Sequence, residues 1–313
     1  MFNRSLHKKI REITVAGSYR RRKETVGDLD ILVTCKRGSR EQVMERFVGF
    51  EDVEKTVSKG KTKSTVMLRS GLQVDLRVMA QVSYGAALLY FTGSKPHNIA
   101  VRKIGQGKKL KISEYGVFTG KGKNEKRVAG KTEKKVYETV DLPFIPPELR
   151  EDRGEIEAAK NGNLPDLITL DDIRGDLHVH SKESDGDYTA AEMAEAARKR
   201  GYEYIAVTDH SQRLSVATGL DPDRLEKQIK KIEKLNAKLD GFTILTGIEV
   251  DIMDDGTLDL NDVYCKFVKD NGGAIAVSTD SHRLTDLEFM RFGIGQARRG
   301  WLEASDVINT RKL

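Results

Sequence analysis

The stretch GSYRRRKETVGDLDILVT, residues 17–34, joins a basic loop to two aspartates at the start of an apolar run. Because side chains alternate along a β-strand, Asp28 and Asp30 should share one face while Leu29 and Ile31 enter a core on the other. Two carboxylates on one face repel each other unless a cation lies between them. Hard divalent ions such as Mg²⁺ accept oxygen ligands of this kind and keep positions open for phosphates, so the pair predicts a metal site.

A third aspartate, Asp75, stands alone in the apolar run LQVDLRV, residues 72–78. Burial of a carboxylate without a partner is unfavourable, and a neighbouring strand that brings Asp75 to the same metals would resolve it. Gly17 and Ser18 allow backbone N–H groups to approach a phosphate, and Arg21 can bind one through two donors. These parts indicate nucleotidyl transfer, in which two metal ions stabilise the attacking and leaving oxygens. The alternative, an exposed acid pair on an edge strand beside a basic turn, leaves Asp75 unexplained.

The charge of the chain is divided unevenly. Residues 1–150 contain 32 Lys and Arg against 16 Asp and Glu, a net charge of +16, whereas residues 151–313 contain 22 against 32, a net charge of −10. The basic half is typical of a protein that binds nucleic acid, although the lysine-rich run at 121–127 alone could be a solvated loop. No apolar run approaches the roughly 18 residues of a membrane helix, and the N-terminus has no apolar signal core. The sequence therefore predicts a cytoplasmic protein without a membrane partner.

The order of predicted elements changes in the middle of the chain. Strands are expected from β-branched content and alternation at 13–18, 28–34, 63–70 and 72–79, with a helix at 39–50. A proline-containing, charged break follows at 141–162. Beyond it, apolar strands at 175–181, 203–211, 242–252 and 273–282 alternate with amphipathic helices at 189–201 and 222–241. This second half predicts βα units.

Three segments of the first half, residues 17–34, VDLRV at 74–78 and YFTGSKPHNIAVR at 90–102, resemble the palm and thumb of the family X DNA polymerases, small gap-filling repair enzymes. The resemblance covers about residues 13–145 and implies DNA and a deoxynucleoside triphosphate as partners, with Mg²⁺ or Mn²⁺ as cofactor. It also implies that Asp28, Asp30 and Asp75 bind the metals and that Asp75 takes the proton from the primer 3′-hydroxyl.

The same resemblance implies a set of nucleotide-binding residues: Gly17, Ser18, Arg21, Gly27, Tyr90, Phe91, Gly93, Asn98 and Arg102. Ser18 and Arg21 would hold the triphosphate. The YFTGS turn, which alone could be an ordinary helix-ending turn, would lie against the sugar. Asn98 and Arg102 would contact the incoming base and the template side. Arg22 departs from the family, since some members have glycine there.

Four of the six histidines lie in the acidic half, each in a strand-end motif. The motifs are GDLHVHS with His178 and His180, AVTDHS with Asp209 and His210, GIEVD with Glu249, and STDSH with Asp280 and His282. Borderline ions such as Zn²⁺ or Mn²⁺ accept mixed imidazole and carboxylate ligands, so the clustering predicts a metal centre.

These motifs resemble the PHP (polymerase and histidinol phosphatase) domain, a distorted β/α barrel with ligands at strand C-termini. A PHP domain behind a family X palm and thumb resembles the bacterial and archaeal polymerases, in which it is associated with 3′-to-5′ exonuclease activity. By this resemblance His178, His180, Glu249 and Asp280 would form one metal site. Asp185, His210 and His282 would form another, with Glu249 also facing a middle metal and Asp209 supporting the ligands from behind.

The expected architecture is an α+β nucleotidyltransferase palm (1–80) with a thumb (81–145), a linker (146–174) and an incomplete α/β PHP-type barrel (175–313). Two departures from the family are expected to matter. Only 16 residues precede Gly17, so the DNA grip should be weaker, and a second chain could supply missing parts. Near 258–262, an early and a late part of the PHP domain share one LDL, which suggests an internal deletion.

Three functions stay open at this point. The first is an active family X DNA polymerase with a PHP-type 3′-5′ exonuclease or phosphoesterase domain, which the deletion could impair. The second is a DNA-binding remnant without catalysis. The third is a PHP phosphoesterase that acts on small phosphate esters.

Overall fold

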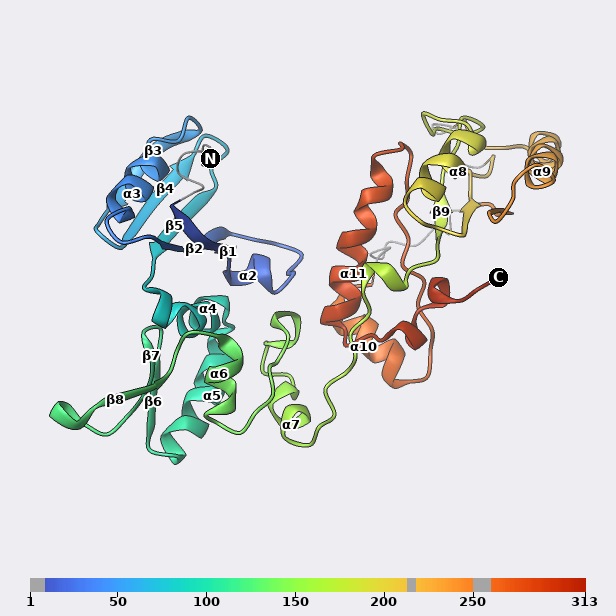
Figure 1. Cartoon of the computed structure of the whole chain (residues 1–313). Coiled ribbons are helices and arrows are strands. Elements are labelled where there is room, and N and C mark those ends of the chain that lie inside the picture. The colour runs from blue at the N-terminus through green and yellow to red at the C-terminus, as the bar shows by residue number, and fades with distance from the viewer. Residues whose placement is uncertain (1–8, 213–217, 250–259) are drawn as a thin grey trace. The chain divides into compact units, whose positions relative to one another are not determined.

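The computed structural model describes residues 9–212, 218–249 and 260–313, and it divides the chain into two compact units, Met1–Leu164 and Pro165–Leu313 (Figure 1). The division lies within the predicted linker. Of the helices in the described ranges, none has the length and apolar character needed to cross a membrane.

The first unit begins with a five-stranded sheet in the order β1-β2-β5-β4-β3. Its strands are β1 (Ile10–Val15), β2 (Asp28–Cys35), β3 (Val53–Lys59), β4 (Lys63–Leu68) and β5 (Gln73–Val78). β2 and β5 run parallel, and the other neighbouring pairs run antiparallel. Helix α3 (Arg40–Val48) packs its buried Val43, Met44 and Phe47 against one face of this sheet. The short helix α2 (Gly17–Arg20) connects β1 to the loop before β2.

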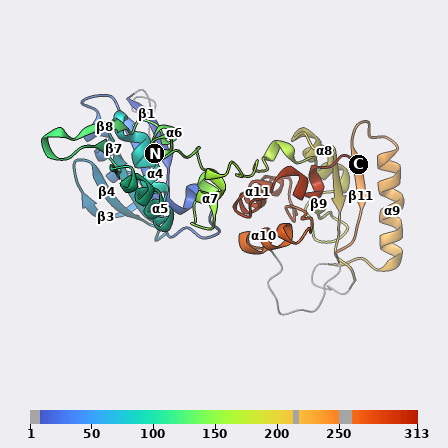
Figure 2. The ribbon, with the colours of Figure 1, turned by 90° about the horizontal axis from the view of Figure 1, so that it is seen from below.

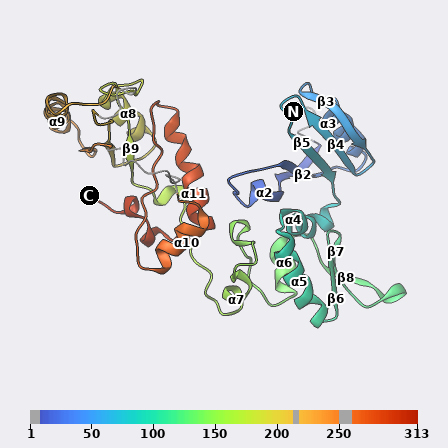
Figure 3. The same cartoon turned by 180° about the vertical axis from the view of Figure 1, so that it is seen from behind.

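Helix α4 (Tyr84–Thr92) links this sheet to the rest of the unit. Ala87 and Leu88 pack with Leu32 on the face of the sheet opposite α3. The chain continues through α5 (Lys95–Gly107) and a three-stranded antiparallel sheet, β6 (Leu110–Ser113), β7 (Gly116–Thr119) and β8 (Lys126–Ala129), and ends in α6 (Glu133–Glu138) and α7 (Glu155–Lys160) (Figure 3). Ser94 caps α5 and Thr132 caps α6, since each side chain accepts a backbone N–H of the first turn.

The second unit contains, within its described residues, a parallel sheet in the order β11-β10-β9: β9 (Gly175–Val179), β10 (Tyr204–Val207) and β11 (Thr243–Thr246). Its helices are α8 (Ala190–Lys199), α9 (Pro222–Asn236), α10 (Asp262–Asp270) and α11 (Met290–Arg299), and α9 runs beside β11 (Figure 2). Met193, Ile205 and Ile232 belong to the core of this unit. Because the strands are parallel, their carboxyl ends meet at one edge.

The expected strand at 273–282 is wrong. In the structure this segment makes only isolated bridges, Ile275 with Val307 and Ser281 with Val179. In a strand, the backbone N–H groups of this segment would donate to a neighbouring strand. Here two of them donate to side chains instead: Val277 N donates to Asn309 Oδ1 (3.0 Å), and Thr279 N donates to Asp176 Oδ1 (3.2 Å). The segment therefore meets β9 at a single bridge and forms no regular strand.

Other strands also differ from expectation. The strand expected at 13–18 ends at Val15 and is followed by helix α2. The strand expected at 242–252 is regular only over Thr243–Thr246, and residues 250–252 lie outside the described ranges. β3 had no counterpart among the predicted strands, because its sequence VEKTVSK has few apolar residues and is mostly exposed.

Candidate active sites

The three aspartates of the first unit lie on two neighbouring strands. In the parallel pairing of β2 with β5, Asp30 lies opposite Asp75, and Asp28 lies opposite Gln73. Asp28 and Asp30 share the face of β2 on which Leu32 contacts α4, while Ile31 and the rest of the other face enter the core beneath α3. The three aspartates thus lie on neighbouring strands, with Asp30 directly opposite Asp75.

The electrostatics of this cluster show an excess of negative charge. Burial, followed by the charges of Asp28 and Asp75, raises the pKa of Asp30. Burial would also raise the pKa of Asp75, but hydrogen bonds from Lys63 and Thr65 and the charges of Lys63 and Arg77 outweigh it and lower that pKa. A cation among the carboxylates would remove the repulsion that raises the pKa of Asp30.

Lys63 and Thr65 were not predicted. Both lie on β4, and their side chains hold Asp75: Lys63 Nζ is 2.8 Å from Oδ2, and Thr65 Oγ1 donates to Oδ1 at 2.6 Å. They alternate on a strand with Ser64 between them, and the antiparallel pairing puts Thr65 opposite Asp75. The alternation of Lys63 and Thr65 is visible in the sequence, but only the pairing of β4 with β5 shows that both side chains face Asp75.

The basic loop lies close to the acidic strand. Gly17 has φ +65°, a conformation that favours glycine, and a Cβ there would lie 3.0 Å from Asp30 Oδ2. Arg21 Nε donates to Glu151 Oε1 at 2.9 Å, and its Nη1 donates to the carbonyl of Thr92. Ser18 lies in α2. Gly27 immediately precedes Asp28, in open surroundings.

Other predicted nucleotide-binding residues gather around one small surface pocket. Tyr90, Asn98 and Arg102 are among its lining residues. The side chain of Asn98 donates from Nδ2 to the carbonyl of Tyr90 (2.7 Å), and Arg102 Nε donates to the carbonyl of Asn98 (3.3 Å). Phe91 packs edge-on against Tyr90, with the ring centroids 5.0 Å apart. Gly93 ends the helix with φ +70°.

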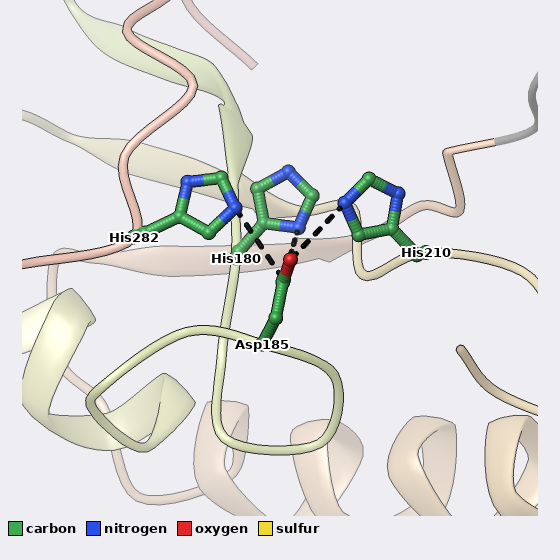
Figure 4. A group of neighbouring side chains, drawn as sticks. All are labelled: His180, Asp185, His210 and His282. Carbon is green, nitrogen blue, oxygen red and sulfur yellow. Dashed lines mark ion pairs between the residues drawn. The ribbon is translucent and has the colours of Figure 1, made fainter. Parts of the chain in front are cut away.

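In the second unit, histidines and acids meet at the carboxyl ends of the strands. One group consists of His180, Asp185, His210 and His282, and Figure 4 shows the Asp185 carboxylate facing the three imidazoles. The distances from Asp185 carboxylate oxygens are 3.5 Å to His180 Nδ1, 3.5 Å to His210 Nε2 and 3.4 Å to His282 Nε2. A second group consists of His178, His180 and Asp280.

The structure changes the predicted division of these ligands. His180 was assigned to one site with His178, Glu249 and Asp280, but it belongs to both groups. Glu249 lies between them, because its Oε2 is 3.3 Å from His178 Nε2, 3.3 Å from His180 Nε2 and 3.1 Å from His210 Nδ1. The result is one continuous cluster.

The donor set fits metal binding. Among the described residues, the buried Nδ1 atoms of His180 and His210 have no hydrogen-bond partner, even though carboxylate oxygens lie near them. Imidazole nitrogens and carboxylates that face one point are the donor types that hold an ion such as Zn²⁺. Hydrogen bonding from His180, against the effect of burial, lowers the pKa of Asp280 and keeps it an anionic ligand.

Two buried acids support the cluster from behind. Asp209 accepts Ser181 N (2.7 Å), Ser181 Oγ (2.5 Å) and Gln228 Nε2, which ties the loop before Asp185 to α9. Asp209 was predicted as such a support. Asp176 was not predicted, although it precedes His178 by two residues; burial raises its pKa to about 6.

Three known protein families match successive parts of the chain. The DNA polymerase beta palm family matches residues 3–86, the DNA polymerase beta thumb family residues 87–151, and the PHP domain family residues 176–303. A nucleotidyltransferase palm and thumb followed by a PHP domain defines the class of protein. The chain belongs to the bacterial family X DNA polymerases that carry a PHP domain.

Relatives match different parts of the chain. The DNA polymerase/3′-5′ exonuclease PolX of Bacillus subtilis (strain 168) is 43% identical over 385 residues, which cover 95% of this chain and 66% of that protein. A probable phosphatase of Thermoanaerobacter sp. (strain X514) is 37% identical over 87 residues, 27% of this chain and 33% of that protein. A polymerase beta of Leishmania infantum, solved as a ternary complex, is 28% identical with a TM-score of 0.42, covering 47% of this chain and 69% of that one.

The alignment with the Bacillus protein is longer than this chain. It extends over 385 residues, whereas this chain has 313. The Bacillus protein must therefore contain internal residues without a counterpart here.

Proposed function

We propose that the first unit adds deoxynucleotides to a DNA primer, as in gap filling during DNA repair, and that Asp28, Asp30 and Asp75 carry the reaction. The observation that supports this most strongly is the pairing of Asp30 with Asp75 across two parallel strands, with Asp28 on the same face. Separate strands thereby supply three carboxylates to one place. The basic residues of this half, with a net charge of +16, suit a DNA partner.

Mg²⁺ or Mn²⁺ suits these three carboxylates, and when bound it would stabilise the attacking and leaving oxygens of an in-line displacement. Asp75 would accept the primer hydroxyl proton, and its hydrogen bonds from Lys63 and Thr65 favour the ionised form that this role needs. Arg21 would hold the triphosphate. Tyr90, Asn98 and Arg102 would contact the nucleotide and template from the pocket that they line.

Primer extension on a gapped DNA duplex with Mn²⁺ tests this function. Wild-type protein should incorporate nucleotides, and Asp28→Ala should lower the rate by at least about a thousandfold, because a metal ligand is lost. Asp52→Asn, at an exposed aspartate of the same unit, is the control and should retain the wild-type rate. If wild-type protein incorporates no nucleotide at any concentration, the result would contradict the polymerase function and favour a DNA-binding remnant without catalysis.

We propose a second activity, hydrolysis of phosphoesters at the histidine cluster, with the 3′ end of DNA as substrate. The continuous group of four histidines with Asp185, Glu249 and Asp280 supports it. Zn²⁺ or Mn²⁺ suits this donor set and would supply a bound water as nucleophile at neutral pH. The predicted deletion could impair this activity without touching the aspartates.

A nuclease assay on single-stranded DNA separates this activity from the first. His180→Ala should abolish release of 3′ nucleotides and lower bound Zn or Mn, while primer extension stays at the wild-type rate. Hydrolysis of small phosphate esters with no attack on DNA would instead favour the small-ester phosphoesterase.

A cytoplasmic location is also proposed, and fractionation of the source cells would test it.

A further inference from the structure

The guanidinium of Arg21 is held on two sides by residues from the end of the first unit. Its Nε donates to Glu151 Oε1 at 2.9 Å, and its Nη1 donates to the carbonyl of Thr92. Both partners of the ion pair are largely covered, with 12% of the Arg21 and 14% of the Glu151 side chain exposed. We propose that Glu151 is a positioning residue, which fixes the Arg21 guanidinium for the triphosphate. This inference rests on the proposed nucleotidyl transfer.

Glu151 can act in this way because its backbone is anchored. Its neighbour Arg150 is fully buried, donates from Nε to the carbonyl of Ile145 (2.9 Å) and from Nη1 to Glu133 (2.7 Å), and accepts Ser94 N through its carbonyl (3.0 Å). Three hydrogen bonds to one buried residue leave the next residue little freedom. The backbone of Glu151 is therefore held next to a well-anchored residue.

The neighbouring Arg20 is bound by a different acid, Glu133. Its two Nη atoms bind the two oxygens of Glu133 at 2.9 and 2.7 Å, and Nη1 also donates to Thr92 Oγ1. This bidentate pair occupies the end of the guanidinium that could grip a phosphate. Arg20 therefore joins the loop to α6. Arg21 meets a different acid, Glu151, through Nε, and donates from Nη1 to the carbonyl of Thr92.

The physical benefit comes from pre-organisation. An arginine side chain in water occupies many rotamers, and ordering it when the nucleotide binds costs binding free energy. A charge-assisted hydrogen bond to Glu151 orders the guanidinium beforehand. Glu151 lies 130 residues from Arg21 in the sequence, so the triphosphate site and the end of the thumb are coupled through one ion pair.

The test is calorimetric titration of the full chain with Mn²⁺ and a deoxynucleoside triphosphate, using Arg21→Ala, Glu151→Ala and the double variant. Glu151→Ala should weaken nucleotide binding about tenfold, since the guanidinium would no longer be ordered before the nucleotide binds. In the Arg21→Ala background it should have no further effect, because Glu151 acts only through Arg21. In primer extension, the KM for the nucleotide should rise while kcat stays within about twofold. Glu157→Gln, at an exposed glutamate of α7, is the control and should bind as wild type.

Each outcome decides between the possibilities. Equal or tighter binding by Glu151→Ala would overturn the inference, and tighter binding would identify Glu151 as a competitor of the triphosphate. Equal losses with and without Arg21 would show that Glu151 has only a general structural role. Wild-type protein that binds no nucleotide would overturn the proposed function and this inference together, whereas normal wild-type binding with an unaffected variant would overturn the inference alone.

Discussion

At the scale of single residues, the first unit places charges where they destabilise the metal-free protein. Asp30 lies beside Asp28 and opposite Asp75, and its pKa is raised by burial and by both neighbours. An acid with a raised pKa favours the folded state only while it is protonated. Its contribution to stability is therefore lost as the pH rises from the ordinary value of 3.8 through the raised pKa.

Asp30→Asn should stabilise the metal-free protein at pH 7 by about 1 kcal/mol, because one repelling charge is removed. Urea unfolding with a chelator present measures this difference. Addition of Mn²⁺ should stabilise wild-type protein and have less effect on the variant, since a ligand is lost. If Asp30→Asn is less stable than wild type in chelator, the carboxylates of Asp28 and Asp75 do not exert a net repulsion on Asp30.

A different buried residue should make the first unit sensitive to acid. His97 is fully buried, with Nδ1 2.6 Å from Glu155 Oε1 and Nε2 2.8 Å from the hydroxyl of Tyr137. Burial lowers its pKa below 6.5, although the bond to Glu155 opposes this, while hydrogen bonds from His97 and from backbone N–H groups lower the pKa of Glu155. Neutral His97 thus donates to an ionised Glu155 and accepts from Tyr137.

Since the unfolded chain binds a proton at His97 below about pH 6.5 and the folded chain does not, stability should fall as the pH drops from 7 to 5. The slope from this residue is at most about 1.4 kcal/mol per pH unit. His97→Gln should be less stable at pH 7, because Glu155 and Tyr137 lose a partner, but its stability should depend less on pH. Urea midpoints at several pH values test this, and parallel curves would show that His97 does not titrate on unfolding.

At the scale of elements, α4 joins the sheet of the first unit to the helices that follow. Leu88 packs near Leu32 of β2, while Gly85 N and Ala86 N donate to the carbonyls of Lys131 and Gly130 just before α6. A Cβ at Gly85 would lie 2.1 Å from the carbonyl carbon of Thr132. Only glycine allows the helix to approach that backbone.

Gly85→Ala should therefore lower the free energy of unfolding by about 3 kcal/mol, the upper range for overpacking. Gly107→Ala is the matched control, because a Cβ at Gly107 has open space around it, near the end of α5. The control should be neutral or slightly stabilising. Thermal unfolding measures both variants, and equal melting temperatures for the two would show that α4 can move away from α6 without cost.

Elements with strong alternation were predictable from sequence, and those that depend on distant partners were not. The apolar and acidic alternation of 28–34 and 72–79 fixed β2, β5 and the shared face of their aspartates. The segment 273–282 has the composition of a strand, but Asn309 and Asp176 capture its backbone groups from far along the chain. The contact of Glu151 with Arg21 could not be predicted for the same reason, since the two residues are 130 positions apart in the sequence.

At the scale of the whole molecule, we propose that the second unit is a shortened barrel. Its described residues contain three regular strands, and the alignment with the Bacillus relative is longer than this chain. The predicted join near 258–262 falls partly outside the described residues. Directly after it, α10 exposes 51% of Val263, 57% of Tyr264 and 64% of Phe267. Neighbouring apolar side chains with this exposure are typical of a surface that contacts another part of a protein or a partner.

Sequencing of the source locus across residues 250–265 tests the deletion directly. A continuous reading frame identical to this chain is expected. Additional βα units encoded between the two parts would show that the join is an artefact and that the natural barrel is complete. In that case a longer chain should cover Val263, Tyr264 and Phe267.

The most direct test of the three-aspartate metal site is anomalous diffraction from crystals soaked with Mn²⁺ and a deoxynucleoside triphosphate. Manganese should appear between the carboxylates of Asp28, Asp30 and Asp75, with the phosphates on its open side and near Arg21. Manganese confined to the histidine cluster, with the three aspartates empty at saturating Mn²⁺, would contradict metal-dependent nucleotidyl transfer by this chain.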